Sequence, residues 1–186
     1  MVEEFSETLR AAQAGEEWAI ARLWRALQPR LLRYLRGRAG SAAEDVASET
    51  WIRVARNLHT FEGGEAEFCG WFFTLARRAL IDWQRKACRR PRTITLEDQN
   101  GVTSRDDPVA EAVERLAMDG VLQLMSQLPE DQADVILLRV VAGLDTTRVA
   151  EMLGRPPGTV RVLQHRGLRR VAELLAAVPH SERAAS

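Results

Sequence analysis

The closing third of the chain, residues 128–175, constrains the fold most, because helical patterns follow one another there with almost no residues between them. Gly143 ends the first pattern, and only residues 154–156 separate the second from the third. A separation this short leaves no room for a loop, so the two helices must cross sharply, as in a helix-turn-helix. The second helix of that motif enters the major groove of DNA. The segment therefore predicts a binding module rather than a catalytic one.

Local side chains in this segment fit the same layout. Asp145 is a candidate N-cap, because its carboxylate can accept a backbone N–H that has no partner in the first turn. Pro129 and Pro157 suit first helical positions, where the missing N–H costs nothing. Apolar residues at helical spacing predict one buried face on each of the last two helices. They are Val149 and Leu153 on the second helix, and Val160, Leu168, Val171 and Leu175 on the third.

The other face of the third helix is basic. Arg161, His165 and Arg169 recur every four residues, which places them in one stripe, and Arg166 flanks that stripe. An arginine can grip guanine through two hydrogen bonds or hold a phosphate. For a lone charged helix the alternative is a basic face that only contacts solvent. The short turns that separate three successive helices favour DNA contact here.

Charge is sorted along the chain although the formal net charge is zero. Residues 68–92 carry seven Arg or Lys against one acid, whereas residues 97–119 carry seven acids against two Arg. The sequence therefore predicts two basic patches with an acidic joint between them.

The chain as a whole predicts an all-α fold of two small helical domains joined by an irregular acidic linker, since no period-2 strand pattern occurs. Helices are expected over residues 5–14, 18–36, 42–58 and 71–90, with Ser41 and Glu44 as a capping box before the third. The third should bury Val46, Thr50, Val54 and Leu58. Prolines at both ends and an Asn-Gly turn signal mark residues 91–108 as the linker. The predicted domains are residues 1–90 and 109–178, followed by a tail, 179–186.

Residue types that carry chemistry are sparse. Cys69 and Cys88 have no CxxC pair or Cys/His cluster beside them, which predicts buried thiols in a reducing compartment, no metal site and no cofactor. No His/Asp/Glu cluster or phosphate-binding loop occurs, so the chain is not expected to be an enzyme. No apolar run approaches the length of a membrane span, and the acidic N-terminus has no signal-peptide core. The expected location is the cytoplasm, without membrane insertion.

The helix expected from Trp71 mixes aromatic and cationic side chains. The aromatics are Trp71, Phe72, Phe73 and Trp83, and the cations are Arg77, Arg78, Arg85, Lys86, Arg89 and Arg90. Exposed aromatics can stack unpaired bases while cations hold the strand backbone. Taken alone, Trp71 and Phe72 fit a core position better.

Four segments of the chain carry a resemblance to a known family. They are GEEWAIARLWRALQPRLLRYLR, AEDVASETWIRVARNL, GWFFTLARRALIDWQRK and LPEDQADVILLRVVAGLDTTRVAEMLGRPPGTVRVLQHRGLRR. The last three, in this order, resemble the bacterial RNA polymerase sigma factors of the extracytoplasmic-function (ECF) group, in the sigma-70 superfamily, and the first resembles the opening helix of that family. The resemblance implies a transcription initiation factor that joins core RNA polymerase and directs it to promoters. The implied partners are the clamp helices of the largest polymerase subunit, the flap of the second largest, promoter DNA and, as is common in the family, an anti-sigma factor.

The resemblance also implies roles for individual residues. Polymerase docking falls on Asp45, Ser48, Glu49 and Ile52. Reading and melting of the −10 element fall on Phe61, Arg77, Arg78, Asp82, Arg85, Lys86 and Arg89. Reading of the −35 element falls on Arg161, Val162, His165, Arg166 and Arg169.

The chain departs from the family pattern at five of the matched positions. Ser48 stands in place of a usual Gln, Arg78 of a frequent Asn, Arg148 of a usual Glu, Pro156 of a usual Ser and Val162 of a small polar residue. The alternative function is a dimeric helix-turn-helix regulator with a helical sensor domain. That alternative needs dimer surfaces and a two-fold symmetric operator, and it does not explain the aromatic and basic helix from Trp71.

Overall fold

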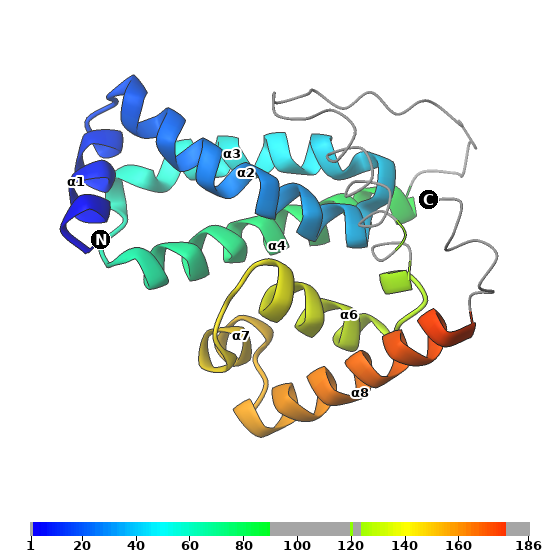
Figure 1. The fold of residues 1–186 in the computed structure, drawn as a ribbon. Helices are drawn as coiled ribbons and strands as arrows, with labels where there is room; N and C mark the ends of the chain where they lie inside the picture. Colours follow the sequence, from blue (N-terminus) through cyan, green and yellow to red (C-terminus); the bar gives the residue numbers. More distant parts are fainter. Residues whose placement is uncertain (1, 90–119, 121–123, 178–186) are drawn as a thin grey trace, which may run out of the picture.

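The structure is a computed structural model, and it describes residues 2–89, 120 and 124–177. Every element in these ranges is helical, with no strand among them, which confirms the all-α fold class. Four helices and two short 3-10 turns make up an N-terminal unit (Figure 1). They are α1 (Val2–Gln13), α2 (Glu17–Ala39), η1 (Gly40–Ala42), α3 (Ala43–Asn57), η2 (Leu58–Thr60) and α4 (Glu65–Arg89). The predicted linker, 91–108, and tail, 179–186, lie outside the described residues.

The C-terminal unit is a three-helix arrangement in the order expected for a helix-turn-helix. Its elements are α6 (Glu130–Ile136), the π-helical turn η3 (Leu137–Val141), α7 (Thr146–Leu153) and α8 (Pro157–Ala177). Arg139 on η3 donates hydrogen bonds to the Leu144 carbonyl and to Gln164 Oε1, the latter at 3.3 Å. One side chain therefore ties together η3, the turn before α7, and α8.

Aromatic side chains fill the core of the N-terminal unit. Phe72 and Phe73 on α4 are fully buried with ring centroids 5.3 Å apart, and Phe73 lies edge-on against Tyr34 of α2 at 5.8 Å. Burying a side chain of this size contributes roughly 1.5–3 kcal/mol, so these rings supply much of what holds α4 against α2 and α3. The four residues that α3 was predicted to bury are all buried: Val46, Thr50, Val54 and Leu58.

The start of α3 differs from the sequence prediction. Residues 40–42 form the 3-10 turn η1, so α3 begins at Ala43 with Ala42 in the N-cap position and no side-chain cap. The predicted capping box of Ser41 and Glu44 is therefore wrong, because Ser41 lies in the 3-10 turn, one residue before the N-cap position.

Two other helix starts also differ. Pro129 is the N-cap of α6 rather than its first residue, with ψ at 140°. The helix expected from Trp71 begins earlier, at Glu65. Its start is stabilised locally, since the Glu67 carboxylate accepts a hydrogen bond from the Gly64 N–H at 3.1 Å.

The buried face of α8 is rotated from the predicted one. Leu168 and Leu175 were expected in the core but are 44% and 40% exposed. Gly167 is buried instead, and a Cβ there would lie 2.6 Å from Ile136 Cδ1 of α6. The absence of a side chain lets α6 and α8 approach closely at this point, and that approach sets the rotation of α8.

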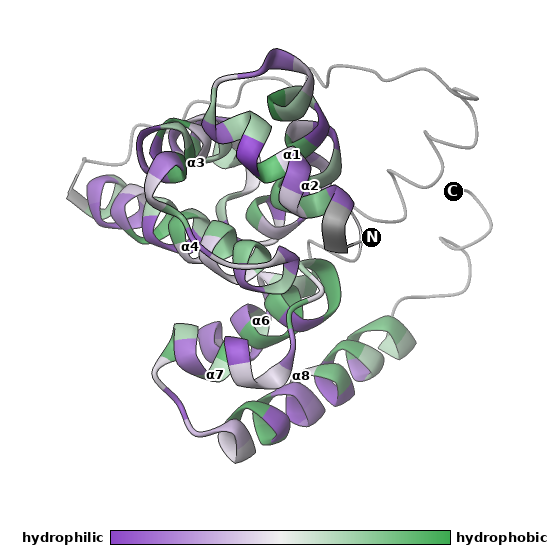
Figure 2. Cartoon of the chain, turned by 90° about the vertical axis from the view of Figure 1, so that its left-hand side faces the viewer, coloured by the Kyte–Doolittle hydropathy of each residue, from purple (hydrophilic) through white to green (hydrophobic). Residues whose placement is uncertain are grey.

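The two units pack against each other. The C-terminal helices lie below α4, on the side away from α3 (Figure 1), and the view turned by 90° shows the same stacking (Figure 2). Ion pairs cross from α2 and α4 to α6, and another joins the start of α4 to α7.

Candidate nucleic-acid and polymerase interfaces

The helix-turn-helix is built by local chemistry that the sequence predicted. The Asp145 carboxylate accepts a hydrogen bond from the Arg148 N–H at 2.8 Å, so it caps α7 as expected. Gly154 ends α7 in the left-handed conformation, with φ at 61°, which a residue with a side chain rarely adopts. Pro157 is the first residue of α8, as predicted. These three residues fix where α8 begins and how it crosses α7.

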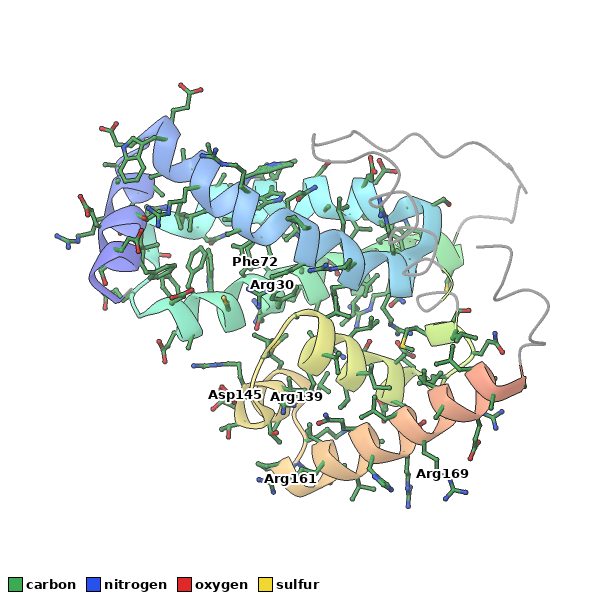
Figure 3. The ribbon with its side chains drawn as sticks, viewed as in Figure 1. Arg30, Phe72, Arg139, Asp145, Arg161 and Arg169 are labelled. Carbon is green, nitrogen blue, oxygen red and sulfur yellow. The ribbon has the colours of Figure 1, made fainter. Side chains whose placement is uncertain are left out.

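The predicted −35 residues share the outer side of α8. Arg161, Val162, His165, Arg166 and Arg169 are all exposed. Arg161 and Arg169 point away from the rest of the molecule (Figure 3). Arg169 pairs with Glu173 at 3.0 Å, but both side chains are largely exposed, and such a pair contributes little. The structure therefore leaves this basic face open to a partner.

The predicted −10 residues of α4 divide between two sides of the helix. Arg78, Arg85 and Lys86 are exposed, and Asp82 pairs with Arg53 of α3 at 2.9 Å. Arg77 lies on another side of α4, facing the C-terminal unit. Arg89 is the last residue of α4, and its side chain lies outside what the structure describes.

Phe61 belongs to an aromatic cluster at the start of α4. Its ring centroid is 5.2 Å from that of Phe68 and 5.1 Å from that of Trp71. Gln13 of α1 holds the loop, because its Nε2 donates to the carbonyl oxygens of Phe61 at 2.8 Å and Leu58 at 3.0 Å. Phe61 and Trp71 are both half-buried, so a predicted burial of Trp71 is only partly correct.

The predicted polymerase-docking residues lie together on the outer face of α3. Asp45, Ser48, Glu49 and Ile52 are all exposed, and Ile52 exposes 45% of its surface. Glu49 pairs with Arg53 at 2.9 Å. The Glu49 hydrogen bond is the main cause that raises the pKa of the Arg53 guanidinium, and Asp82 adds to it. Arg53 therefore lies between the predicted docking face and the predicted −10 helix.

Two residues that sequence reasoning missed, Asp134 and Arg38, form a charge cluster with Arg77 where the units meet. Asp134 of α6 is buried, with its Oδ1 2.8 Å from Arg38 Nε and its Oδ2 3.6 Å from Arg77 Nη2. Burial raises the pKa of the Asp134 carboxyl, while Arg38 and Arg77 act in the opposite direction. The signal in the sequence is a lone acid in the apolar run of residues 133–138.

The cysteines differ from their predicted state. Both thiols are free, but Cys88 is exposed, so the expected burial is wrong for it. Cys69 is half-buried, and burial raises the pKa of its thiol. Within the described part of the chain, no group of three His, Cys, Asp or Glu side chains could hold a metal ion. None of the helices described is long and apolar enough to cross a membrane.

Comparison with known proteins decides the family. The Sigma-70 region 2 family model matches residues 23–90, and the Sigma-70, region 4 model matches residues 118–171. The ECF RNA polymerase sigma factor ShbA of Streptomyces griseus is 32% identical over 173 residues, which cover 88% of this chain and 91% of ShbA. The chain belongs to the ECF RNA polymerase sigma factors. This sigma factor is thus a protein of transcription initiation, in a family whose members are not enzymes.

Other relatives agree with this assignment. BldN of Streptomyces coelicolor is 30% identical over 171 residues, covering 91% of this sigma factor and 65% of BldN. SigD of Mycobacterium tuberculosis is 29% identical over 182 residues, covering 94% and 85%. Two solved structures share the fold, CnrH in complex with the cytosolic domain of CnrY (TM-score 0.66) and Bartonella quintana RpoE in complex with the anti-sigma factor NepR (0.64). Each is 19% identical to this chain, covering 94% and 86% of it and 99% and 98% of the respective neighbour.

Proposed function

We propose that this sigma factor binds core RNA polymerase, reads −35 duplex DNA with α8 and holds the melted −10 strand with α4. The observation that carries the proposal is the exposed basic face of α8. This helix belongs to a helix-turn-helix whose preceding helix, α7, is capped by Asp145. In this proposal residues 1–90 form the polymerase and −10 domain, 109–178 form the −35 domain, and 91–108 link them.

At the −35 element, α8 supplies contacts to base edges. Arg161 is exposed in the second turn of α8, at the end where a recognition helix contacts bases, and Arg166 is exposed near the middle of the helix. Each can donate two hydrogen bonds to guanine or hold a phosphate. Val162 lies between them and is 48% exposed, so its methyl groups suit contact with a thymine methyl.

At the −10 element, α4 stabilises DNA that is already unpaired. Unpairing a base costs a few kcal/mol, and the chain needs no catalytic group to lower that cost. Arg78 and Arg85 are exposed along α4 and suit the strand backbone, while the half-buried Phe61 ring can stack on one flipped base. Interactions made only with the melted state shift the population toward it.

The exposed face of α3 is the proposed polymerase contact. Asp45, Ser48, Glu49 and Ile52 would meet the clamp helices of the largest subunit, and the C-terminal unit would meet the flap of the second largest. An anti-sigma factor is a further proposed partner. It is supported by the fold neighbour RpoE, whose structure holds the anti-sigma factor NepR.

Reconstitution with core polymerase tests the proposal. The double variant Asp45→Arg, Glu49→Arg should lose co-elution with core enzyme while its circular dichroism stays helical, because both acids are exposed and outside the core. Asp131→Asn is a control, since it removes an exposed acid from α6 instead. Undiminished co-elution of the double variant would refute the docking assignment. A dimer of the free chain on a symmetric operator would indicate a conventional regulator instead.

A further inference from the structure

The contact between the two units covers one side of α4 with residues of the C-terminal unit. Gly70, Thr74 and Arg77 share that side at helical spacing. Arg77 is held there by the carboxylate of Asp134, which is 4% exposed. We infer that the C-terminal unit is an internal competitor of the melted strand, with Asp134 taking the place of a DNA phosphate on Arg77. This inference rests on the proposed −10 role of α4.

Asp134 is placed for this contact and not for the C-terminal core. Its ion-pair partners are Arg38 of α2 and Arg77 of α4, both in the other unit. Glu130, one turn earlier on α6, also pairs with Arg38 at 2.7 Å. A buried carboxylate is costly unless it is paired. Opening the contact would therefore leave Asp134 in water and free Arg77, without removing any partner that α6 has within its own unit.

Two further arginines cross the contact at separate places. Arg148 of α7 lies over Gly70, where a Cβ would come within 2.5 Å of Arg148 Cδ, and its Nη2 is 3.5 Å from Glu67 Oε1. Arg30 of α2 donates a hydrogen bond to the Ala142 carbonyl at the end of η3. Arg148 therefore contacts the start of α4 both through its aliphatic stem at Gly70 and through its charge at Glu67.

The closed contact places α7 beside the path proposed for the melted strand. The groove between α4 and α7 has a volume of about 500 Å³, and it is lined by Phe61, Trp71, Arg77 and Arg78 on one side and by Arg148 and Glu151 on the other. A strand that stacked on Phe61 and reached Arg77 would meet Arg148 and Glu151 of α7 in this groove and would compete with Asp134 for Arg77. Three of the lining residues, Glu62, Glu67 and Glu151, are acidic, and their negative charge repels a phosphate backbone. The outer face of α8 stays open in the same state.

The inference has a quantitative consequence. When only a fraction of molecules is open, the apparent dissociation constant for a ligand of the open form rises by the inverse of that fraction. Removing the Asp134 charge takes from Arg77 its counter-charge at the contact and leaves Arg38 with the exposed Glu130 alone, which disfavours closure. Asp134→Asn should therefore expand the free chain and raise its affinity for single-stranded DNA about tenfold.

The test uses the full chain without polymerase. Small-angle scattering measures its expansion, and fluorescence anisotropy measures binding of a short labelled single-stranded oligonucleotide of randomised sequence at constant salt. Asp131→Asn is the matched control, because it removes the same charge from α6 but breaks only an exposed pair with Arg155 at 2.8 Å, inside the C-terminal unit. It should change neither measurement beyond the general effect of one charge.

Arg148→Ala distinguishes the effect of opening the contact from the effect of losing one positive charge. It removes a positive charge, which alone weakens DNA binding, yet it should raise affinity because it opens the contact. Arg22→Ala, whose ion-pair partner Glu4 lies in the same unit, is the control for losing one arginine and should lower affinity slightly. A loss of affinity in Arg148→Ala as large as in Arg22→Ala would overturn the inference.

A second substitution distinguishes failure of this inference from failure of the proposed function. Arg85→Ala is made in the Asp134→Asn background. Asp134→Asn could expand the chain without binding single-stranded DNA more tightly than the parent chain does. If its binding still depends on Arg85, that result overturns the internal competitor but not the proposed −10 role. Binding that ignores Arg85 overturns the proposed −10 role, and the inference with it. No expansion in Asp134→Asn shows that the closed contact does not depend on Asp134 and overturns the inference directly.

Discussion

The two helices proposed to contact DNA, α8 and α4, differ in what surrounds their cations. The basic residues of α8 all lie on its outer face, and nothing in the other unit pairs with them among the residues described. On α4 the cations are divided, with Arg78 and Arg85 exposed and Arg77 held by Asp134. The helix proposed to read duplex is thus accessible in the free chain, whereas the helix proposed to hold single strand is partly occupied. Access to melted DNA then becomes a property of the whole molecule.

The two helices also differ in what holds them in place. The position of α8 depends on near neighbours in sequence, namely the Asp145 cap, Gly154 and Pro157. The position of α4 depends on aromatic packing against α2 and α3, which are distant in sequence. Damage to the aromatic core should therefore affect α4 and spare α8, and damage to α8 should do the reverse.

The largest expected effect comes from Phe72→Ala. Phe72 is fully buried and packs edge-on against Trp51 at 5.1 Å, so its truncation should cost about 3–5 kcal/mol of unfolding free energy in the N-terminal unit. Denaturant unfolding followed by tryptophan fluorescence measures the loss, because all five tryptophans lie in that unit. Amide hydrogen exchange of the same variant compares the two helices. If α8 loses its protection at the same denaturant concentration as α4, the two units do not differ in the way described.

The next effect concerns α8. Arg161→Ala and Arg166→Ala should each weaken use of the −35 element by about 1–3 kcal/mol, through loss of a base contact. Transcription in vitro from a cognate promoter measures this. Because α8 is open in the free chain, the loss should be the same with and without Asp134→Asn. Unchanged transcription with both arginine variants would mean that the recognition face is misassigned.

A third prediction concerns the exposed stripe of α4. Arg78→Ala with Arg85→Ala should impair open-complex formation more than initial duplex binding, because these side chains contact DNA only after unpairing. A promoter with a preformed bubble across the −10 region should partly restore activity, since the unpairing cost of a few kcal/mol per flipped base is removed. Equal defects on duplex and bubble templates would reduce the role of these arginines to holding phosphates.

The smallest expected effect tests which face of α8 is buried. Leu174 is half-buried against the core, so Leu174→Ala should cost on the order of 1 kcal/mol. Leu168 is 44% exposed, and Leu168→Ala should stay within about 0.5 kcal/mol. Thermal melts of the two variants measure the difference. If Leu168→Ala lost more stability than Leu174→Ala, the buried face of α8 would be the one that the apolar spacing predicted.

The sequence predicted features that short-range chemistry determines. The Asp145 cap, the Gly154 end of α7, the Pro157 start of α8 and the buried residues of α3 all followed from spacing and residue type. The face of α8 did not, because its apolar residues lie on more than one side and the contact of Gly167 with Ile136 selects one. The pairing of Asp134 with Arg38 was also beyond reach, since it depends on how two units meet rather than on any local pattern.

The amide of Gln13 has a consequence for how this protein can be divided. Gln13 belongs to α1, which precedes the part of the chain that the region 2 family model matches. Yet its single side chain satisfies two carbonyl oxygens of the loop that carries Phe61. A fragment trimmed to the matched region would keep every proposed −10 side chain and still lose the brace that orients the first of them. The shortest fragment that keeps this loop braced is therefore longer than the part that the family model matches.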